Sequence, residues 1–133
     1  MLRFLRLQNW KSYYEPVEFT MVATRERRHG DRLARVGRSR ILPITAVYGA
    51  NAAGKSALVD GLEALSGIVL ESRRAGAMLP VAPHLPEGRD EPTAFAVEIV
   101  VSAVGADDDA ADRVFYYELA ADRRRVHREL GLH

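Results

Sequence analysis

The chain has 133 residues, and 47% of them are apolar, which is enough for one modest hydrophobic core. Its 19 lysines and arginines nearly balance 18 acidic residues, leaving a formal net charge of +1, so any basic surface has to be local. No cysteine is present, which excludes disulfides and thiolate metal sites and fits a cytoplasmic location. The longest apolar stretch, "TAFAVEIVVSAVGA", contains Glu98 and is shorter than the roughly 18 residues of a membrane span, so we expect no membrane contact.

The first 40 residues combine two short strands with a basic segment. Alternating apolar side chains predict two strands within residues 1–23. Residues 24–40 contain seven arginines but only two acidic side chains, and Gly30 and Gly37 interrupt any helix there. We therefore expect a basic loop, which is either solvated or a phosphate-contacting surface for nucleic acid.

A nearly uninterrupted apolar run and a helical pattern follow. The run "ILPITAVY", residues 41–48, is typical of a strand that is buried on both faces in a parallel sheet. Apolar residues then recur at helical spacing, which predicts a helix with one buried face from Gly54 to about Arg74. Residues 41–74 are thus expected to form a strand, a loop and a helix in that order.

The remaining residues divide into a proline-rich connection and further strands. Four prolines mark residues 75–92 as irregular. Residues 93–133 are expected to form antiparallel strands, because "FAVEIVVSAV" and "RVFYYELA" flank the turn-like "GADDDAAD", with a third strand over 124–130. The run from Asp107 to Asp109 is interpreted as a solvated turn, and the four scattered histidines lack the spacing of metal ligands.

The stretch "GANAAGKS", residues 49–56, matches the phosphate-loop (Walker A) pattern G-x-x-x-x-G-K-[ST] between the expected strand and helix. Glycines let the backbone approach a phosphate without an intervening Cβ, so successive N–H groups can converge on one anion at the helix N-terminus. Lys55 would supply a mobile positive charge for the β- and γ-phosphates, and the Ser56 hydroxyl would ligate Mg²⁺. The alternative is a glycine-rich turn without a ligand. The predicted phosphate-contacting residues are Gly49, Asn51, Ala52, Ala53, Gly54, Lys55, Ser56 and Ala57.

Two stretches, "LRFLRLQNWKSY" and "ILPITAVYGANAAGKSALVDGLEAL", resemble the start of the ABC-type ATPases of the SMC, RecF and OLD kind, especially the bacterial AAA15-like ATP-binding proteins. In that family the first strand leads into an Asn-aromatic-basic-Ser pattern, which Asn9, Trp10, Lys11 and Ser12 match. The resemblance implies that Lys11 and Ser12 lie near the nucleotide and that Trp10 packs beside it. The alternative is that Trp10 belongs to the core and Lys11 is solvated surface.

The phosphate loop carries part of the same resemblance. The family commonly has asparagine at the third loop position, as Asn51 is here, whereas Ala52 stands where many relatives have glycine. That alanine would be mildly strained if its backbone needs a positive φ. The resemblance implies ATP and Mg²⁺ as the cofactors, since no residue pattern here distinguishes adenine from guanine.

Hydrolysis in that family needs an apolar strand that ends in Asp-Glu and a signature loop from a second subunit. The apolar runs "FAVEIVV" and "VFYYELA" contain Glu98 and Glu118 without a preceding aspartate, and Gln8 is too early for the family's glutamine loop. We therefore identify no catalytic residue in this chain. The complete protein is expected to hydrolyse ATP with residues that this chain does not contain.

Together these patterns predict an α/β fold, namely a P-loop NTPase lobe with a Walker A strand–loop–helix and an antiparallel β-subdomain. We expect a single N-terminal lobe of an incomplete ATPase head, which binds ATP and Mg²⁺ and acts on DNA or a partner effector in phage defence or DNA repair. Expected partners are the rest of the ATPase or a second, homo-oligomeric subunit. The alternatives are a non-hydrolysing, nucleotide-dependent assembly module and a nucleic-acid-binding module that uses the basic loop.

Overall fold

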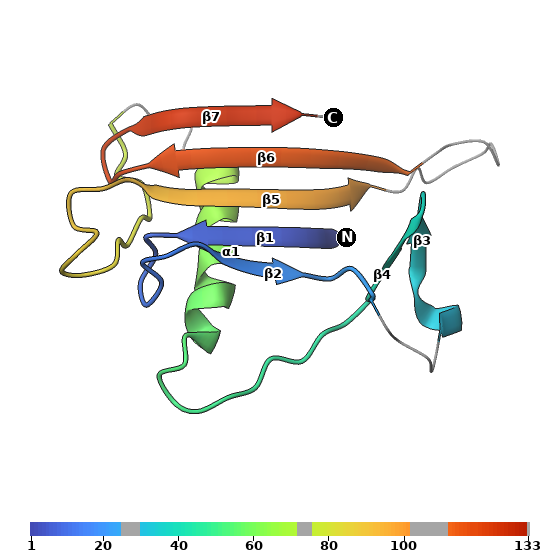
Figure 1. Ribbon diagram of the computed structural model, residues 1–133. Coiled ribbons are helices and arrows are strands. Elements are labelled where there is room, and N and C mark those ends of the chain that lie inside the picture. Colours follow the sequence, from blue (N-terminus) through green and yellow to red (C-terminus); the bar gives the residue numbers. More distant parts are fainter. Residues whose placement is uncertain (25–29, 72–75, 102–111, 133) are drawn as a thin grey trace.

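The computed structural model describes residues 1–24, 30–71, 76–101 and 112–132. In this part of the chain it contains seven strands, one short 3-10 helix and one α-helix (Figure 1). In chain order the elements are β1 (Leu2–Gln8), β2 (Val17–Thr20), η1 (Gly30–Arg32), β3 (Ala34–Val36), β4 (Ser39–Ile41), α1 (Lys55–Glu71), β5 (Thr93–Val101), β6 (Arg113–Ala121) and β7 (Val126–Leu132).

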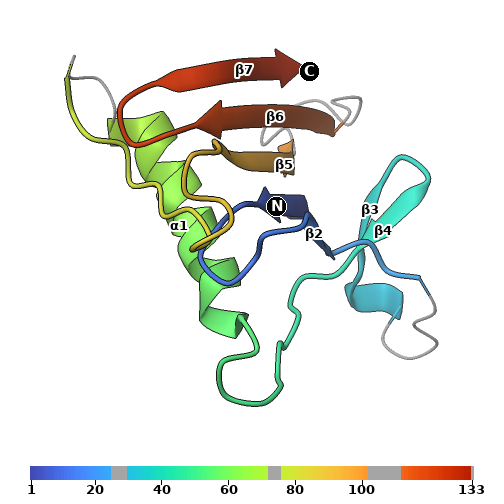
Figure 2. The same ribbon diagram turned by 60° about the vertical axis from the view of Figure 1, so that its left-hand side comes forward.

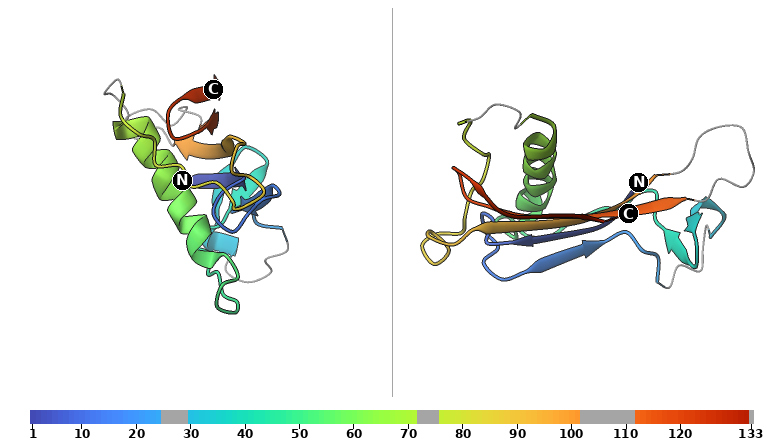
Figure 3. Two further views of the ribbon diagram at one scale, coloured as in Figure 1. Left: turned by 90° about the vertical axis from the view of Figure 1, so that its left-hand side faces the viewer. Right: turned by 90° about the horizontal axis from the view of Figure 1, so that it is seen from above.

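Five strands form one sheet in the order β2-β1-β5-β6-β7, and every neighbouring pair is antiparallel. Alternation along β1 explains which face is buried, because Leu5 and Leu7 are almost fully buried while Arg6 between them is exposed. Phe95 of β5 and Leu119 of β6 share the buried side with them. Figure 3 shows that α1 crosses this one face of the sheet.

The helix α1 contacts the sheet through one apolar stripe. Its buried residues Ala57, Ala64, Leu65 and Ile68 recur at helical spacing and join the core under the sheet. Gly61 allows the close approach, since a Cβ there would lie 2.7 Å from a Leu7 methyl carbon. The helix ends within the described residues at Glu71, so the rest of the expected helix, residues 72–74, lies outside them.

The hairpin β3–β4 forms a second, two-stranded sheet at the end of the larger one (Figure 3). Val36 and Ile41 are buried against Val100 of β5 in a small apolar cluster of their own. Part of the expected basic loop is therefore a strand pair, and its Gly37 has a φ of 55° at the first turn position, where a type II′ turn takes glycine. Residues 25–29 of that segment lie outside the described part.

The expected α/β P-loop lobe is wrong. The structure is mostly antiparallel sheet, with a single α-helix among the described residues. The apolar run 41–48 is not a buried parallel strand, because only Ile41 belongs to a strand and Ile44 and Tyr48 are 81% and 88% exposed. Figure 2 shows this segment passing from β4 to α1 without joining the sheet.

The physical reason for this error is that a run of apolar residues does not by itself show that the segment is buried. A strand that is covered on both faces needs neighbouring strands on both sides. In the described residues the large sheet ends at β2 and β7, and no strand pairs with residues 43–54. The strands expected near each end of the chain are present as β1, β2, β5, β6 and β7.

None of the helices in the described residues combines the length and the apolar character needed to cross a membrane.

Candidate phosphate-binding site

A hollow of about 480 Å³ lies at the N-terminus of α1. The loop before the helix forms one wall, and the turn that follows β1 contributes the other. Nearly all of the sequence-predicted site residues meet here. The lining consists of Lys11, Ser12, Asn51, Ala52, Ala53, Gly54, Lys55, Ser56, Ala57 and Asp60.

The loop backbone turns through two left-handed residues, Ala52 (φ 63°) and Gly54 (φ 83°). Such turns direct successive N–H groups toward one point and so create a concave site for an anion. The carbonyl of Gly54 accepts the N–H of Leu58, which leaves the N–H groups of the first helical residues, Lys55 to Ala57, without intrahelical acceptors. The three residues that carry these donors line the hollow, which lies at the positive end of the helix dipole.

Only one of the two motif glycines is required by this conformation. A Cβ at Gly54 would lie 2.7 Å from the Tyr13 ring and 3.0 Å from the Ser12 hydroxyl oxygen. At Gly49 the φ is not left-handed, and a Cβ would meet only the Cβ of Ala53 at 3.7 Å, an ordinary contact. Gly49 does not line the hollow, so the expectation that it contacts phosphate has no counterpart in this geometry.

The Lys55 side chain folds back over the loop. Its Nζ donates to the carbonyl oxygen of Gly49 at 2.7 Å and to that of Ala50 at 2.5 Å. An ammonium group has three N–H donors, so these two bonds fix its position and leave one donor for an anion. The lysine therefore both closes the loop and keeps a charge at the edge of the hollow.

The turn after β1 holds the loop in place. The Tyr13 hydroxyl donates to the Gly54 carbonyl oxygen at 2.6 Å, and burial raises the pKa of this phenol above its ordinary 10.0. The hydroxyl is consequently a protonated donor at neutral pH. Tyr13 was not singled out by the sequence pattern, and only its position directly after the "NWKS" motif could have suggested it.

Lys11 and Asp60 form an ion pair across the edge of the hollow. Asp60 was missed in the sequence, although its spacing of four residues from Ser56 places both on one face of the helix. The backbone N–H of Lys11 donates to the Ala82 carbonyl oxygen at 2.7 Å, which fixes the turn against the proline-rich connection. Lys11 is thus an exposed surface residue, as the alternative interpretation held, and it is anchored by these two contacts.

Trp10 belongs to the core, as one of the two interpretations of the sequence held. It is 2% exposed, and its ring meets that of Phe95 edge-on with centroids 5.4 Å apart. Its indole Nε1 donates to the Ala57 carbonyl oxygen at 2.7 Å. Trp10 therefore connects the turn after β1 to the first turn of α1 and positions the hollow without lining it.

Asn9 joins the same turn to the proline-rich connection. Its side-chain Nδ2 donates to the carbonyl oxygens of Gly88 (2.8 Å) and Glu91 (2.9 Å), and its Oδ1 accepts the His84 N–H (2.9 Å). Its own carbonyl accepts the Thr93 hydroxyl at 2.7 Å. A residue that satisfies this many partners while 2% exposed is a structural centre of the fold.

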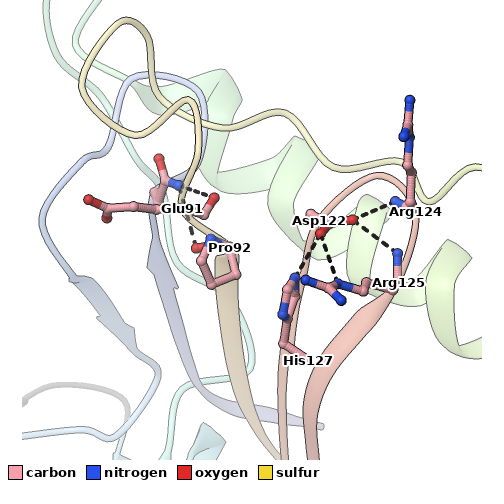
Figure 4. A network of polar contacts seen from close by, with 7 residues as sticks. Glu91, Pro92, Asp122, Arg124, Arg125 and His127 are labelled. Carbon is pink, nitrogen blue, oxygen red and sulfur yellow. Dashed lines mark hydrogen bonds and ion pairs between the residues drawn. The ribbon is translucent and has the colours of Figure 1, made fainter.

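A larger hollow of about 870 Å³ lies between the proline-rich connection and the turn joining β6 to β7. Its lining mixes apolar residues with side chains of both charges, including Asp90, Asp122 and Arg123. Figure 4 shows that the Asp122 carboxylate is already bonded to the backbone of Arg124 and Arg125 and to His127. Three acidic residues, Asp90, Glu91 and Asp122, line this larger hollow, whereas the smaller one lies at the positive end of the α1 dipole, so we regard the smaller hollow as the better phosphate site.

The two glutamates considered as catalytic substitutes are bonded elsewhere. Glu98 pairs with Arg3 at 2.7 Å, and Glu118 accepts the Tyr116 hydroxyl at 2.7 Å and pairs with Arg128 at 3.3 Å. Both lie on the strands of the sheet, away from the hollow. Within the described ranges, no three His, Asp or Glu side chains gather as they would around a metal ion.

Comparisons with protein-family models, with curated proteins and with solved structures found no match to this chain.

Proposed function

We propose that residues 51–57 bind the triphosphate of ATP together with Mg²⁺. The observation that carries this proposal is the hollow at the start of α1, where left-handed backbone at Ala52 and Gly54 and an anchored Lys55 line one concave surface. A loop of this kind favours an anion with several oxygens, because its N–H groups, the helix dipole and the Lys55 ammonium group together make the electrostatic potential of the site positive.

The chemistry of the lining fits both ligands. The unsatisfied N–H groups at Lys55 to Ala57 and the third donor of Lys55 are suited to phosphate oxygens. Mg²⁺ prefers oxygen ligands and would take the Ser56 hydroxyl, while neutralising charge on the phosphates. Asp60 is the one carboxylate lining this hollow among the described residues, and its pairing with Lys11 limits its repulsion of an anion.

The resemblance to ABC-type ATPases supports ATP rather than another nucleotide. On the same basis we propose that the chain works in the cytoplasm with the rest of an ATPase or a second copy, on DNA or a partner effector. Asp60 is the one carboxylate lining the hollow among the described residues, and it is paired with Lys11, so the activity proposed for these residues is binding without hydrolysis.

A nucleotide-dependent assembly role is a second candidate. Exposed apolar side chains support it, since Ile44, Val47 and Tyr48 before the loop and Val59 and Leu70 on α1 are all open to solvent. Apolar surface of this kind is typical of contacts with another protein. Following a nucleotide titration by light scattering tests the assembly role, because that role requires the mass of the particle to change when nucleotide binds.

The test of nucleotide binding is Lys55→Ala, measured by titration with a fluorescent ATP analogue and Mg²⁺. Loss of one charge-assisted bond is expected to weaken binding about 10- to 100-fold. The matched control is Arg38→Ala, which removes an exposed positive charge at the hairpin β3–β4 and should leave the affinity unchanged. Equal affinity for Lys55→Ala and the unmodified protein would refute the proposed site.

A further inference from the structure

The hairpin β3–β4 presents a row of arginines on one face and apolar residues on the other. Ala34, Val36 and Ile41 pack inward. Arg35 and Arg40, which alternate with them along the two strands, are exposed. Arg38 in the turn and Arg32 just before β3 are exposed as well. Because side chains alternate between the two faces of a strand, one face of the hairpin packs on the protein and the other faces solvent.

Two of these arginines oppose each other directly. The register of the hairpin pairs Arg35 with Arg40, so both side chains leave the same face at neighbouring positions. Like charges directly across an antiparallel pair are destabilising. None of the ion pairs found in the described part of the chain includes Arg32, Arg35, Arg38 or Arg40.

The hairpin is fixed to the large sheet rather than free to reorient. The carbonyl of Arg40 accepts the Ala23 N–H at 2.8 Å, and the Leu42 N–H donates to the Met21 carbonyl oxygen at 2.8 Å. Arg3 of β1 also reaches the Ser39 hydroxyl at 3.5 Å. Arg35 and Arg40 are thus held close together and repel each other, and an anion that binds between them would relieve this repulsion.

We propose that this arginine face binds the phosphate backbone of double-stranded DNA. Arginine binds phosphate oxygens through two parallel N–H bonds, and the wide major groove of B-form DNA accommodates a two-stranded ribbon. The major groove of A-form RNA is too deep and narrow for one. No aromatic side chain lies on β3 or β4, as stacking of single-stranded bases would require, and the exposed face lacks the apolar residues that enter a membrane.

This surface is separate from the proposed nucleotide site. Figure 1 shows the hairpin at one end of the sheet and the start of α1 beneath the other half. Binding of DNA and binding of nucleotide can therefore be lost independently, and failure of one proposal does not decide the other.

The experiment measures fluorescence anisotropy of a labelled duplex with the unmodified protein and with Arg35→Gln/Arg40→Gln. Four arginine contacts predict that log affinity falls against log salt concentration with a slope of about −3 to −4, measured from about 50 to 200 mM salt. The double variant should lower that slope to about −2 and weaken binding by about tenfold or more. Circular dichroism establishes that the variant is folded.

The matched control is Arg124→Gln/Arg125→Gln, which removes the same charge from the exposed turn between β6 and β7 at the opposite end of the sheet. It should keep the slope and most of the affinity, and Lys55→Ala should bind the duplex normally. Equal losses in the two double variants would overturn the proposal, since they would show that only net charge matters. Binding to anionic vesicles or polyglutamate with no affinity for the duplex would overturn it as well.

Discussion

Two turns in the described part of the chain hold non-glycine residues in the left-handed region of backbone conformation, and they differ in how that strain is offset. At the corner after β1, Asn9 (φ 49°) is buried and its side chain bonds to four backbone groups. In the loop before α1, Ala52 (φ 63°) is exposed and has no side-chain bond that could stabilise it. Strain of this kind persists only where the surroundings enforce it. The corner is thus self-sufficient, whereas the loop has the form that a ligand would stabilise further.

Replacing Asn9 with alanine tests the self-sufficient turn and should have the largest effect. The change leaves the Gly88 and Glu91 carbonyls and the His84 N–H without partners in a largely buried site. We expect a loss of about 3 kcal/mol or more in the free energy of unfolding, measured by urea denaturation. The control Asn51→Ala, on the exposed loop, should change it by less than about 0.5 kcal/mol. Similar losses for both asparagines would contradict the comparison.

The sequence located features that depend on neighbouring residues. The spacing of glycine, lysine and serine in "GANAAGKS" predicted a turn directly before a helix. The structure places all of the predicted loop residues except Gly49 around one hollow. The turn-like stretch between "FAVEIVVSAV" and "RVFYYELA" likewise predicted the antiparallel pairing of β5 with β6. Whether the hollow binds nucleotide stays a prediction.

What failed depended on partners distant in the sequence. The run 41–48 is as apolar as a buried strand, but burial requires neighbouring strands that the described residues do not supply. Asn9 binds backbone groups about 80 residues away, for which its own surroundings give no signal. Asp60 could have been found, because its spacing from Ser56 places the two side chains on one helix face.

Ala52→Gly tests whether the positive φ of Ala52 destabilises the folded protein. Glycine adopts a positive φ without the clash of a Cβ. The relief of this strain in the folded state should stabilise the protein more than the added entropy of the unfolded chain destabilises it. We expect the free energy of unfolding to rise by about 0.5 to 1 kcal/mol, and the affinity for nucleotide to stay the same or increase. The control Ala53→Gly, where φ is not positive, should lower stability by a similar amount. A loss at both positions would show that Ala52 is not strained.

The smallest effect is expected at a third turn, between β6 and β7, which is stabilised by a charge rather than by burial. The Arg124 N–H donates to the Asp122 carboxylate at 2.7 Å, and His127 adds a second bond, which lowers the pKa of this carboxyl from 3.8 to about 2. A carboxyl whose pKa is lower in the folded state stabilises the turn above about pH 4, and this contribution is lost as the pH falls toward 2. Its exposure to solvent keeps the effect small. NMR titration of the Asp122 carboxyl carbon should report the lowered pKa, with the Arg124 amide shift following it and Asp122→Asn abolishing both changes. A midpoint near 3.8 would show that these bonds do not persist in solution.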